Sequence, residues 1–231
     1  MKYNQFPPSA RQDFFRQFLS FKQTTTTGAR IQFNVPKIES DVGNLDKEDK
    51  VEIAFYNEEL GSPFTLSGYF LASRGGGKVR ISIPRKFNVP DELNSGITQI
   101  IIKKESSPGV LDVDTMSSIM SNMMGFAVFK REIVSAEDFK VHMPNLESEA
   151  SGIEDGDSIN VTGVNMTQDN VGPLRDQATR RTEAMMVRKP GGNPRGPKNF
   201  VGFSLPERAV KLNGWDEGDI VQYIVRKARL G

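Results

Sequence analysis

The chain has 231 residues, no cysteine and a formal net charge of +1 at pH 7. The lack of cysteine excludes disulfides, thiolate metal sites and a thiol nucleophile. No apolar run reaches the length of about 18 residues that a membrane-spanning helix needs. The polar first eight residues do not have the basic and apolar layout of a secretion signal. We therefore expect a cytoplasmic protein, or a virion component if the source is viral, with no membrane contact.

The positive charge gathers in one segment. Residues 174–198 contain seven Lys and Arg against two Asp and Glu, a local balance of +5. Because the whole chain carries +1, the remainder has a balance of about −4. The basic character of the protein therefore belongs to a segment and not to the whole molecule.

Four segments of the chain share one pattern, each placed around a proline: Pro36, Pro84, Pro144 and Pro206. Apolar residues stand one, three and five positions before each proline, and this period of two predicts a strand with one buried face. A proline ends such a strand because it cannot donate to the ladder, and it fits the first turn of a helix. The apolar positions are Ile31, Phe33 and Val35; Val79, Ile81 and Ile83; Phe139, Val141 and Met143; and Val201, Phe203 and Leu205.

The segments after the prolines also agree. A polar stretch of helical length leads to an apolar residue at position nine, then to a Gly-Asp turn or its variant, then to a β-branched strand. The aspartate can bond nearby backbone N–H groups. In the second copy Ile97 replaces it, so we expect that turn to close without a carboxylate. The residues nine positions past the prolines are Leu45, Leu93, Ile153 and Trp215, and those seventeen past are Ile53, Ile101, Val161 and Tyr223.

One more strand is predicted before each copy, so that each copy is strand, strand, helix, strand. The candidate segments are residues 14–21, 64–72, 126–134 and 183–188. The first could equally be an amphipathic helix after the Pro-Pro-Ser at its start.

The repeated unit resembles the AbrB-like swapped-hairpin and double-psi barrel families, the cradle-loop barrels. Their signature is a strand ending in Ile-Pro, a short helix, an apolar-x-x-Gly-Asp turn and a final strand. The closest matches are ISIP with LNSG and FSLP with GWDEGD, and the resemblance covers about residues 30–227. It implies a mainly β fold with short helices, in which two copies make one small β-barrel. Two tandem barrels would then leave no open strand edges.

On this model the chain divides into an N-terminal arm, a first barrel, a linker with a short helix, and a second barrel that carries a basic Gly/Pro-rich loop. The expected ranges are 1–12, 13–105, 106–124, 125–231 and, for the loop, 173–198. A methionine stripe at helical spacing in the linker favours packing over a partner surface. Its members are Met116, Ile119, Met120 and Met123.

Catalysis finds little support in the sequence. The only histidine, His142, lies beside a strand-ending proline and is expected to face solvent. No nucleophile elbow, phosphate-binding loop or zinc-protease motif is present. Carboxylates cluster at residues 46–49 and 154–157, but they fall at the turn of the repeat and do not have calcium-loop spacing. We expect these clusters to be structural, and we expect no enzymatic activity, no metal and no cofactor.

Two Gly-rich basic loops occupy equivalent places, in residues 73–78 and 188–198. Glycines let a backbone approach an anion, and Arg and Lys neutralise phosphates. In AbrB-like DNA-binding proteins, basic residues in the loops and strands that lead into the Ile-Pro strand contact DNA. By that resemblance the candidate nucleic-acid-binding residues are Arg74, Lys78, Arg80, Arg188, Lys189, Arg195 and Lys198. Weaker candidates in the first copy are Arg30 and Lys22.

The leading hypothesis is therefore a non-catalytic regulatory or architectural protein that binds nucleic acid. Duplex DNA is favoured because no aromatic residues interleave with the basic ones, as they do in single-strand surfaces. The alternatives are a structural protein, such as a virion component that forms homo-oligomers or joins other structural proteins, and a protein-recognition module of the double-psi type. The Gly-rich loops could also be plain hairpins or a solubilising arm.

Overall fold

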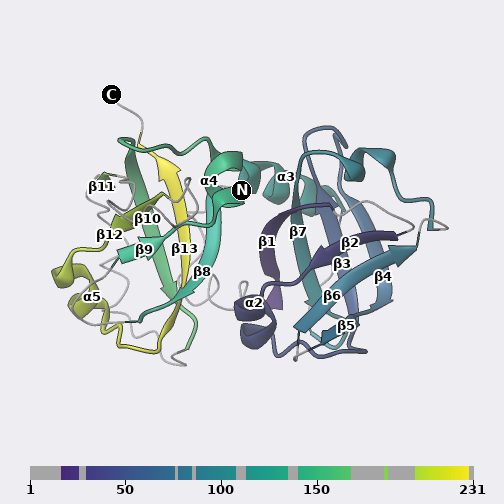
Figure 1. The fold of residues 1–231 in the computed structure, drawn as a ribbon, viewed down its shortest axis with the longest axis horizontal. Coiled ribbons are helices and arrows are strands. Elements are labelled where there is room, and N and C mark those ends of the chain that lie inside the picture. The colour runs from purple at the N-terminus through teal and green to yellow at the C-terminus, as the bar shows by residue number, and fades with distance from the viewer. Residues whose placement is uncertain are drawn as a thin grey trace. The chain divides into compact units, whose positions relative to one another are not determined.

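The structure is a computed structural model, and it describes residues 17–25, 30–75, 78–84, 87–107, 113–134, 140–167, 185–186 and 201–228. The chain forms two compact units, called here the N-terminal unit (residues 15–124) and the C-terminal unit (residues 125–231). Both are mainly β, with antiparallel sheets and short helices (Figure 1). No sheet in the described part of the chain closes on itself. No helix there is both long enough and apolar enough to cross a membrane.

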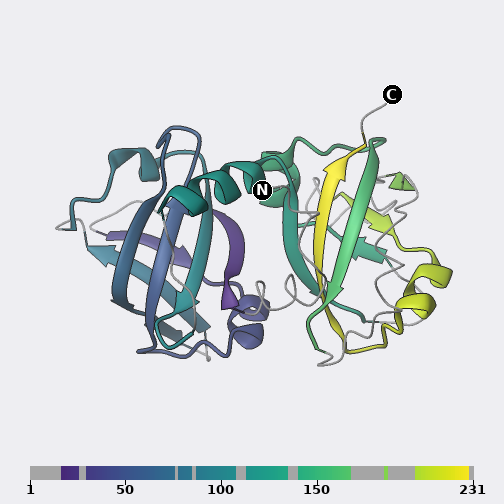
Figure 2. The same cartoon turned by 180° about the vertical axis from the view of Figure 1, so that it is seen from behind.

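The N-terminal unit has two sheets in its described residues, with strand orders β1-β7-β3-β4 and β2-β6-β5. Helix α3 lies against β3 and β7 (Figure 2). The strands are β1 (Leu19–Thr24), β2 (Arg30–Asn34), β3 (Lys50–Tyr56), β4 (Phe64–Phe70), β5 (Ala72–Gly75), β6 (Lys78–Pro84) and β7 (Ile97–Lys104). The helices are α2 (Lys37–Val42), the 3₁₀-helix η3 (Asp91–Asn94) and α3 (Val113–Met124).

The C-terminal unit has the same topology over its described residues. Its sheets have the orders β8-β13-β10-β11 and β9-β12. The strands are β8 (Ala127–Glu132), β9 (Lys140–His142), β10 (Ser158–Asn165), β11 (Met185–Met186), β12 (Gly202–Ser204) and β13 (Ile220–Lys227), and the helices are α4 (Asn145–Ser151) and α5 (Glu207–Asn213).

The strands of neighbouring copies interleave within each unit. Strand β7, from the second copy, lies between β1 and β3, which belong to the first copy. Strand β13, from the fourth copy, lies in the same way between β8 and β10 of the third. Each unit is therefore built from two copies, neither of which contains a complete sheet of its own.

Three of the four prolines have the predicted local structure. Pro36, Pro144 and Pro206 are the N-cap residues of α2, α4 and α5, with φ of −57°, −60° and −60°. The segment after Pro84 differs from the other copies: Pro84 ends β6, Phe87 has 3₁₀ geometry, and η3 follows with Pro90 as its N-cap. Pro90 prevents one continuous helix in this segment, because it lacks a backbone N–H donor and disfavours helical geometry in the residue before it.

The turns confirm the repeat at the level of the backbone. The residue twelve positions past each proline has a positive φ in all four copies: Glu48 69°, Gly96 66°, Gly156 90° and Gly218 88°. Glycine adopts this conformation without a steric penalty. All four copies thus have a left-handed residue at this position, including the copy in which it is a glutamate.

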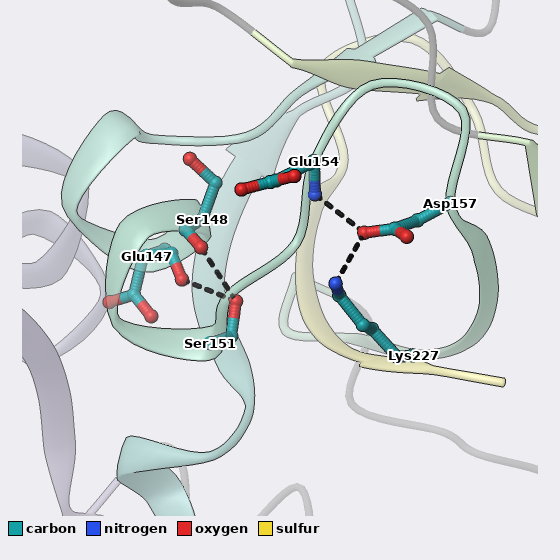
Figure 3. Close-up of polar contacts among 6 residues, drawn as sticks. All are labelled: Glu147, Ser148, Ser151, Glu154, Asp157 and Lys227. Atoms are coloured by element: carbon teal, nitrogen blue, oxygen red, sulfur yellow. Dashed lines mark hydrogen bonds and ion pairs between the residues drawn. The ribbon is translucent and has the colours of Figure 1, made fainter. Parts of the chain in front are cut away.

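The turn aspartates act as predicted in the three copies that have them. The carboxylate of Asp157 accepts the Glu154 N–H at 2.7 Å and pairs with Lys227 at 2.9 Å (Figure 3). At the end of α4 in the same view, the Ser151 hydroxyl donates to the Glu147 carbonyl at 2.6 Å. The equivalent carboxylates accept the N–H three residues back at 2.7 Å (Asp49 from Asp46) and 2.9 Å (Asp219 from Asp216).

The second copy is one residue shorter at its turn, which corrects the predicted alignment. Ile101 lies outside the N-terminal core cluster, whereas Ile100 and Ile102 belong to it. In both units a buried glutamine marks the true register: Gln99 donates to the Phe21 carbonyl, and Gln222 donates to the equivalent Phe129 carbonyl. The residue missing from the second copy is the turn aspartate, so Ile100 and not Ile101 is the counterpart of Tyr223.

The turn of the second copy lacks the aspartate, and an asparagine from the first copy bonds to this turn instead. Asn57, twenty-one positions past Pro36, donates to the Glu92 carbonyl at 2.8 Å. Asn165, twenty-one positions past Pro144, donates to the Asp219 carboxylate at 2.7 Å. The same position thus joins the two copies in both units.

The core of each unit is formed by the predicted inward faces. The described apolar residues before the prolines are all buried, between 0% and 9% exposed. Aromatic rings meet in both cores: Phe33 and Phe55 lie 5.3 Å apart between ring centroids, and Tyr223 contacts Phe129 at 5.6 Å. Met116, Met120 and Met123 of α3 are buried as well, as the packing interpretation of the methionine stripe requires.

Candidate nucleic-acid interface

Strands β2, β6 and β5 of the N-terminal unit form a ribbon (Figure 1). The inner face of this ribbon is apolar. Ile31, Phe33, Val79, Ile81 and Ile83 are at most 3% exposed. Because side chains alternate along a strand, the residues between them lie on the opposite face. That face, called here the basic ribbon, carries Arg30, Gln32, Asn34, Lys78 and Arg80.

The basic ribbon contains no acidic residue. Strands β2, β5 and β6 have four Arg and Lys and no Asp or Glu in their sequences. Arg30 and Lys78 are exposed, and Arg80 is half-buried. None of these three forms an ion pair with another residue of the described part of the chain. Their charges therefore add up on one face, where they favour an anionic partner.

Arg80 lies at the centre of the basic ribbon between two amide side chains. It stands opposite Asn34 in the β2–β6 register. One terminal nitrogen, Nη1, donates to Gln32 Oε1 at 3.5 Å, which is the outer limit of a hydrogen bond. Its Nε atom is shielded from solvent and has no hydrogen-bond partner among the described residues. The guanidinium is thus held in place by a weak contact that leaves donors unused.

Tyr69 of β4 fixes the edge of β6 at Ser82, beyond the first residue of β5, Ala72. Its hydroxyl donates to the Ser82 carbonyl and accepts the Ser82 N–H at 3.2 Å. Burial raises the pKa of Tyr69, although the hydrogen bond with Ser82 and the charge of Arg30 act against the shift. The hydroxyl therefore remains a donor at neutral pH, and it takes the place that a neighbouring strand would have.

The C-terminal unit has a smaller equivalent ribbon, β9–β12. Lys140 stands opposite Ser204, and His142 stands opposite Gly202. Lys140, His142 and Ser204 are exposed, which confirms the prediction that the histidine faces solvent. Counted from the prolines, Lys140 is equivalent to Gln32.

Behind this ribbon lies a half-buried arginine. Arg131 Nε donates to the His142 carbonyl at 3.0 Å, and its guanidinium carbon lies 5.8 Å from the centre of the Phe129 ring. Burial lowers the pKa of Arg131, and the nearby carboxylate of Glu147 acts in the opposite direction. The carboxylate of Glu147 also accepts the Val128 N–H at 2.8 Å, so it holds α4 against β8.

The predicted site residues have different outcomes. Lys78 and Arg80 lie on one face together with Arg30, the weaker candidate. Arg74 falls in β5, but its side chain is not among those described. Lys22 is placed differently from the three residues on that face, because it lies in β1 of the other sheet and is only 5% exposed. The remaining candidates lie outside the described residues: Arg188, Lys189, Arg195 and Lys198.

Sequence reasoning missed the two amide residues of the basic ribbon. Gln32 and Asn34 alternate with buried apolar residues in the printed sequence, and this alternation is the signal that could have placed them beside Arg80. The acidic clusters have the expected structural role at the turns, where Asp49 pairs with Lys104 at 2.9 Å.

Comparison of the chain with protein-family models, curated proteins and solved structures finds no match.

Proposed function

We propose that this protein is a non-catalytic binder of duplex nucleic acid, and that the basic ribbon of the N-terminal unit is its main contact surface. The observation that supports the proposal most is the outward gathering of Arg30, Lys78 and Arg80 on strands without a carboxylate. Basic residues displace the counterions of phosphates, and this release supplies most of the affinity for a duplex.

The dimensions of the ribbon favour a duplex over a single strand. Neighbouring strands lie about 4.8 Å apart, so the two strands that carry the described basic side chains, β2 and β6, are separated by roughly 5 Å. The major groove of B-DNA is about 12 Å wide and admits a two-stranded ribbon. The ribbon presents no aromatic side chain on its outer face, whereas single-strand surfaces stack bases on aromatic rings.

The same proposal includes the finer architecture, two tandem small β-barrels of the AbrB-like or double-psi kind. Its support is the interleaving of copies within each unit and the passage of the chain from one sheet to the other at Leu71, between β4 and β5. The backbone of Leu71 exchanges hydrogen bonds with the first turn, from Glu48 N–H at 2.9 Å and to the Asp49 carbonyl at 3.0 Å. This corner draws the edges of the two sheets together.

The test is the retention of a random-sequence duplex by the full chain at about 50 and about 200 mM salt. We expect the logarithm of affinity to fall linearly with the logarithm of salt, with a slope of about −0.9 for each phosphate contacted. Arg30→Ala and Lys78→Ala should each reduce the size of that slope by about one. Lys37→Ala is the matched control, because Lys37 is exposed on α2, outside the three strands of the ribbon, and its charge pairs with Asp41.

No retention of duplex at the lower salt concentration would overturn the proposal. A variant series in which Lys37→Ala weakens binding as much as Lys78→Ala would overturn the assignment to the ribbon. Light scattering on the same samples reports particle mass, and a large homo-oligomer that fails to retain duplex would favour the assembly alternative instead.

A further inference from the structure

We infer that the basic ribbon discriminates between DNA sequences through Arg80, Gln32 and Asn34, and that the equivalent ribbon of the C-terminal unit contacts phosphates only. This inference rests on the proposed function and adds to it. Phosphate contacts position a protein on a duplex, whereas hydrogen bonds to base edges select the sequence.

The chemistry of the three side chains matches base edges. Arginine donates two hydrogen bonds to O6 and N7 of guanine, and glutamine and asparagine pair with N6 and N7 of adenine. A surface that bound only phosphates would need charge and would not need amides beside the charge. On the basic ribbon the amides flank the central guanidinium, Asn34 across the ladder and Gln32 on the diagonal.

The position of Arg80 suits hydrogen bonding to the edges of bases. A guanidinium has five N–H donors, and the described residues engage one of those of Arg80, in the 3.5 Å contact with Gln32. That contact orients the side chain, and it is long enough to be exchanged for a base edge at small cost. The ladder below is fixed, because Phe33 and Ile81 are fully buried. The three side chains therefore start from a rigid platform.

The C-terminal ribbon lacks the central arginine for a steric reason. Gly202 occupies the position equivalent to Arg80, and a Cβ there would lie 2.7 Å from the Val141 carbonyl oxygen. Contacts this short to backbone do not occur for real Cβ atoms, so no side chain fits without movement of the strand. The exposed groups beside it are Lys140 and His142. A lysine is a point charge that suits phosphate and offers no planar pair of donors.

The experiment is a selection of binding sites from a random duplex pool with the full chain, followed by affinity measurements on the selected and the random duplex. We expect the wild type to enrich a short motif that contains guanine or adenine. Arg80→Ala should bind the selected duplex roughly ten- to a hundredfold more weakly and enrich no motif. Arg80→Lys keeps the charge, and it should retain binding to random duplex but lose the preference.

The controls separate readout from general binding. Lys78→Ala should weaken selected and random duplex by the same factor, because a phosphate contact does not distinguish sequences. Gln32→Ala and Asn34→Ala should each relax the preference at one motif position. Thermal unfolding of each variant, followed by circular dichroism, shows whether the fold is retained. If Arg80→Ala is unfolded, Arg80→Lys alone tests the sequence preference.

The two proposals fail in different ways. A pool that stays random after selection, or an Arg80→Lys variant that keeps the wild-type motif, overturns the inference of readout. Salt-dependent binding in that same experiment leaves the proposed function intact. If the full chain retains no duplex at low salt, the proposed function fails and the inference fails with it.

Discussion

The two units supply a large aromatic ring at equivalent places from different elements, and in the C-terminal unit this ring, Trp215, is partly buried against the core. Phe55 and Gly163 are equivalent strand positions, and Leu93 and Trp215 are equivalent positions after the helical segment. In the C-terminal unit a Cβ on Gly163 would overlap the Trp215 ring, with Cζ2 at 2.8 Å. In the N-terminal unit Phe55 is fully buried and the residue after the helical turn is a leucine. One large ring is thus supplied from the strand in one unit and from the helix end in the other.

The comparison teaches that the repeat conserves volume and backbone path, and not residue identity. The inner faces keep their apolar pattern because the sheets need it, while the outer faces of the ribbons differ, with Arg80 in one unit and Gly202 in the other. Interior packing at near-crystalline density leaves room for such exchanges only when a gain at one position is matched by a loss at its neighbour.

The largest effect is expected from Phe55→Ala. It removes a fully buried ring and leaves a cavity, so we expect the free energy of unfolding to fall by about 3–5 kcal/mol. Urea unfolding followed by circular dichroism measures the loss. Phe70→Ala is the control, because Phe70 is 59% exposed and should change stability by no more than about 0.5 kcal/mol. Equal effects of the two substitutions would contradict the placement of Phe55 in the core.

Gly163→Val tests the packing of the Trp215 ring against β10 in the C-terminal unit. The new side chain meets the Trp215 ring, and we expect a loss of about 1–3 kcal/mol from overpacking. Trp215 is the only tryptophan, so its fluorescence reports unfolding of the C-terminal unit directly. In the double variant with Trp215→Leu the combined loss should be smaller than the sum of the single losses. Strict additivity would show that the two positions do not contact each other.

Substitution of the asparagines that join the two copies of each unit should give smaller losses of stability. Asn57→Ala and Asn165→Ala each remove a buried hydrogen bond to the turn of the partner copy, and we expect a loss of about 1–2 kcal/mol. The loss should be larger for Asn165, because its acceptor is the charged carboxylate of Asp219 and that of Asn57 is a carbonyl. Unfolding in urea measures both variants, and the reverse order would argue against a charge-assisted bond at Asp219.

The smallest expected effect is on the stability of the protein at acid pH. For Asp49 burial raises the pKa, but the Asp46 N–H and Lys104 outweigh it and hold the pKa below the usual range. Lys227 and the Glu154 N–H lower the pKa of Asp157. A depressed pKa contributes stability above the unfolded value of about 3.9, and this contribution is lost as pH falls through the lower folded value.

Replacing both aspartates by asparagine should therefore flatten the fall of the melting temperature between neutral pH and about pH 3. Each partly exposed pair is worth at most about 1 kcal/mol. The second copy has no aspartate at its turn, so Ile97→Val is a matched control that should leave the acid profile unchanged. An unaltered profile in the double asparagine variant would show that other groups control acid unfolding.

The sequence alone predicted the strands before the prolines and their inner faces well, because alternation and a strand-ending proline are local physical constraints. It failed where the constraint is not local. The one-residue loss in the second copy is hidden in the sequence, since Ile97 stands where an aspartate was expected and the strand after it is apolar on both faces. The burial of Lys22 depends on neighbouring elements, and the contact of Gln32 with Arg80 depends on the register of β2 against β6. These features require the paired strands, which no single segment encodes.

The interleaved strand order has a consequence for synthesis on the ribosome. Residues 97–104 form an inner strand of the first sheet, yet they are translated after the three other strands of that sheet. At roughly 5–20 residues per second, the nascent first copy waits for several seconds before its missing strand emerges. Throughout that interval β1 and β3 have apolar faces and unpaired edges, so this stage of translation is the one at which a chaperone would protect the chain most.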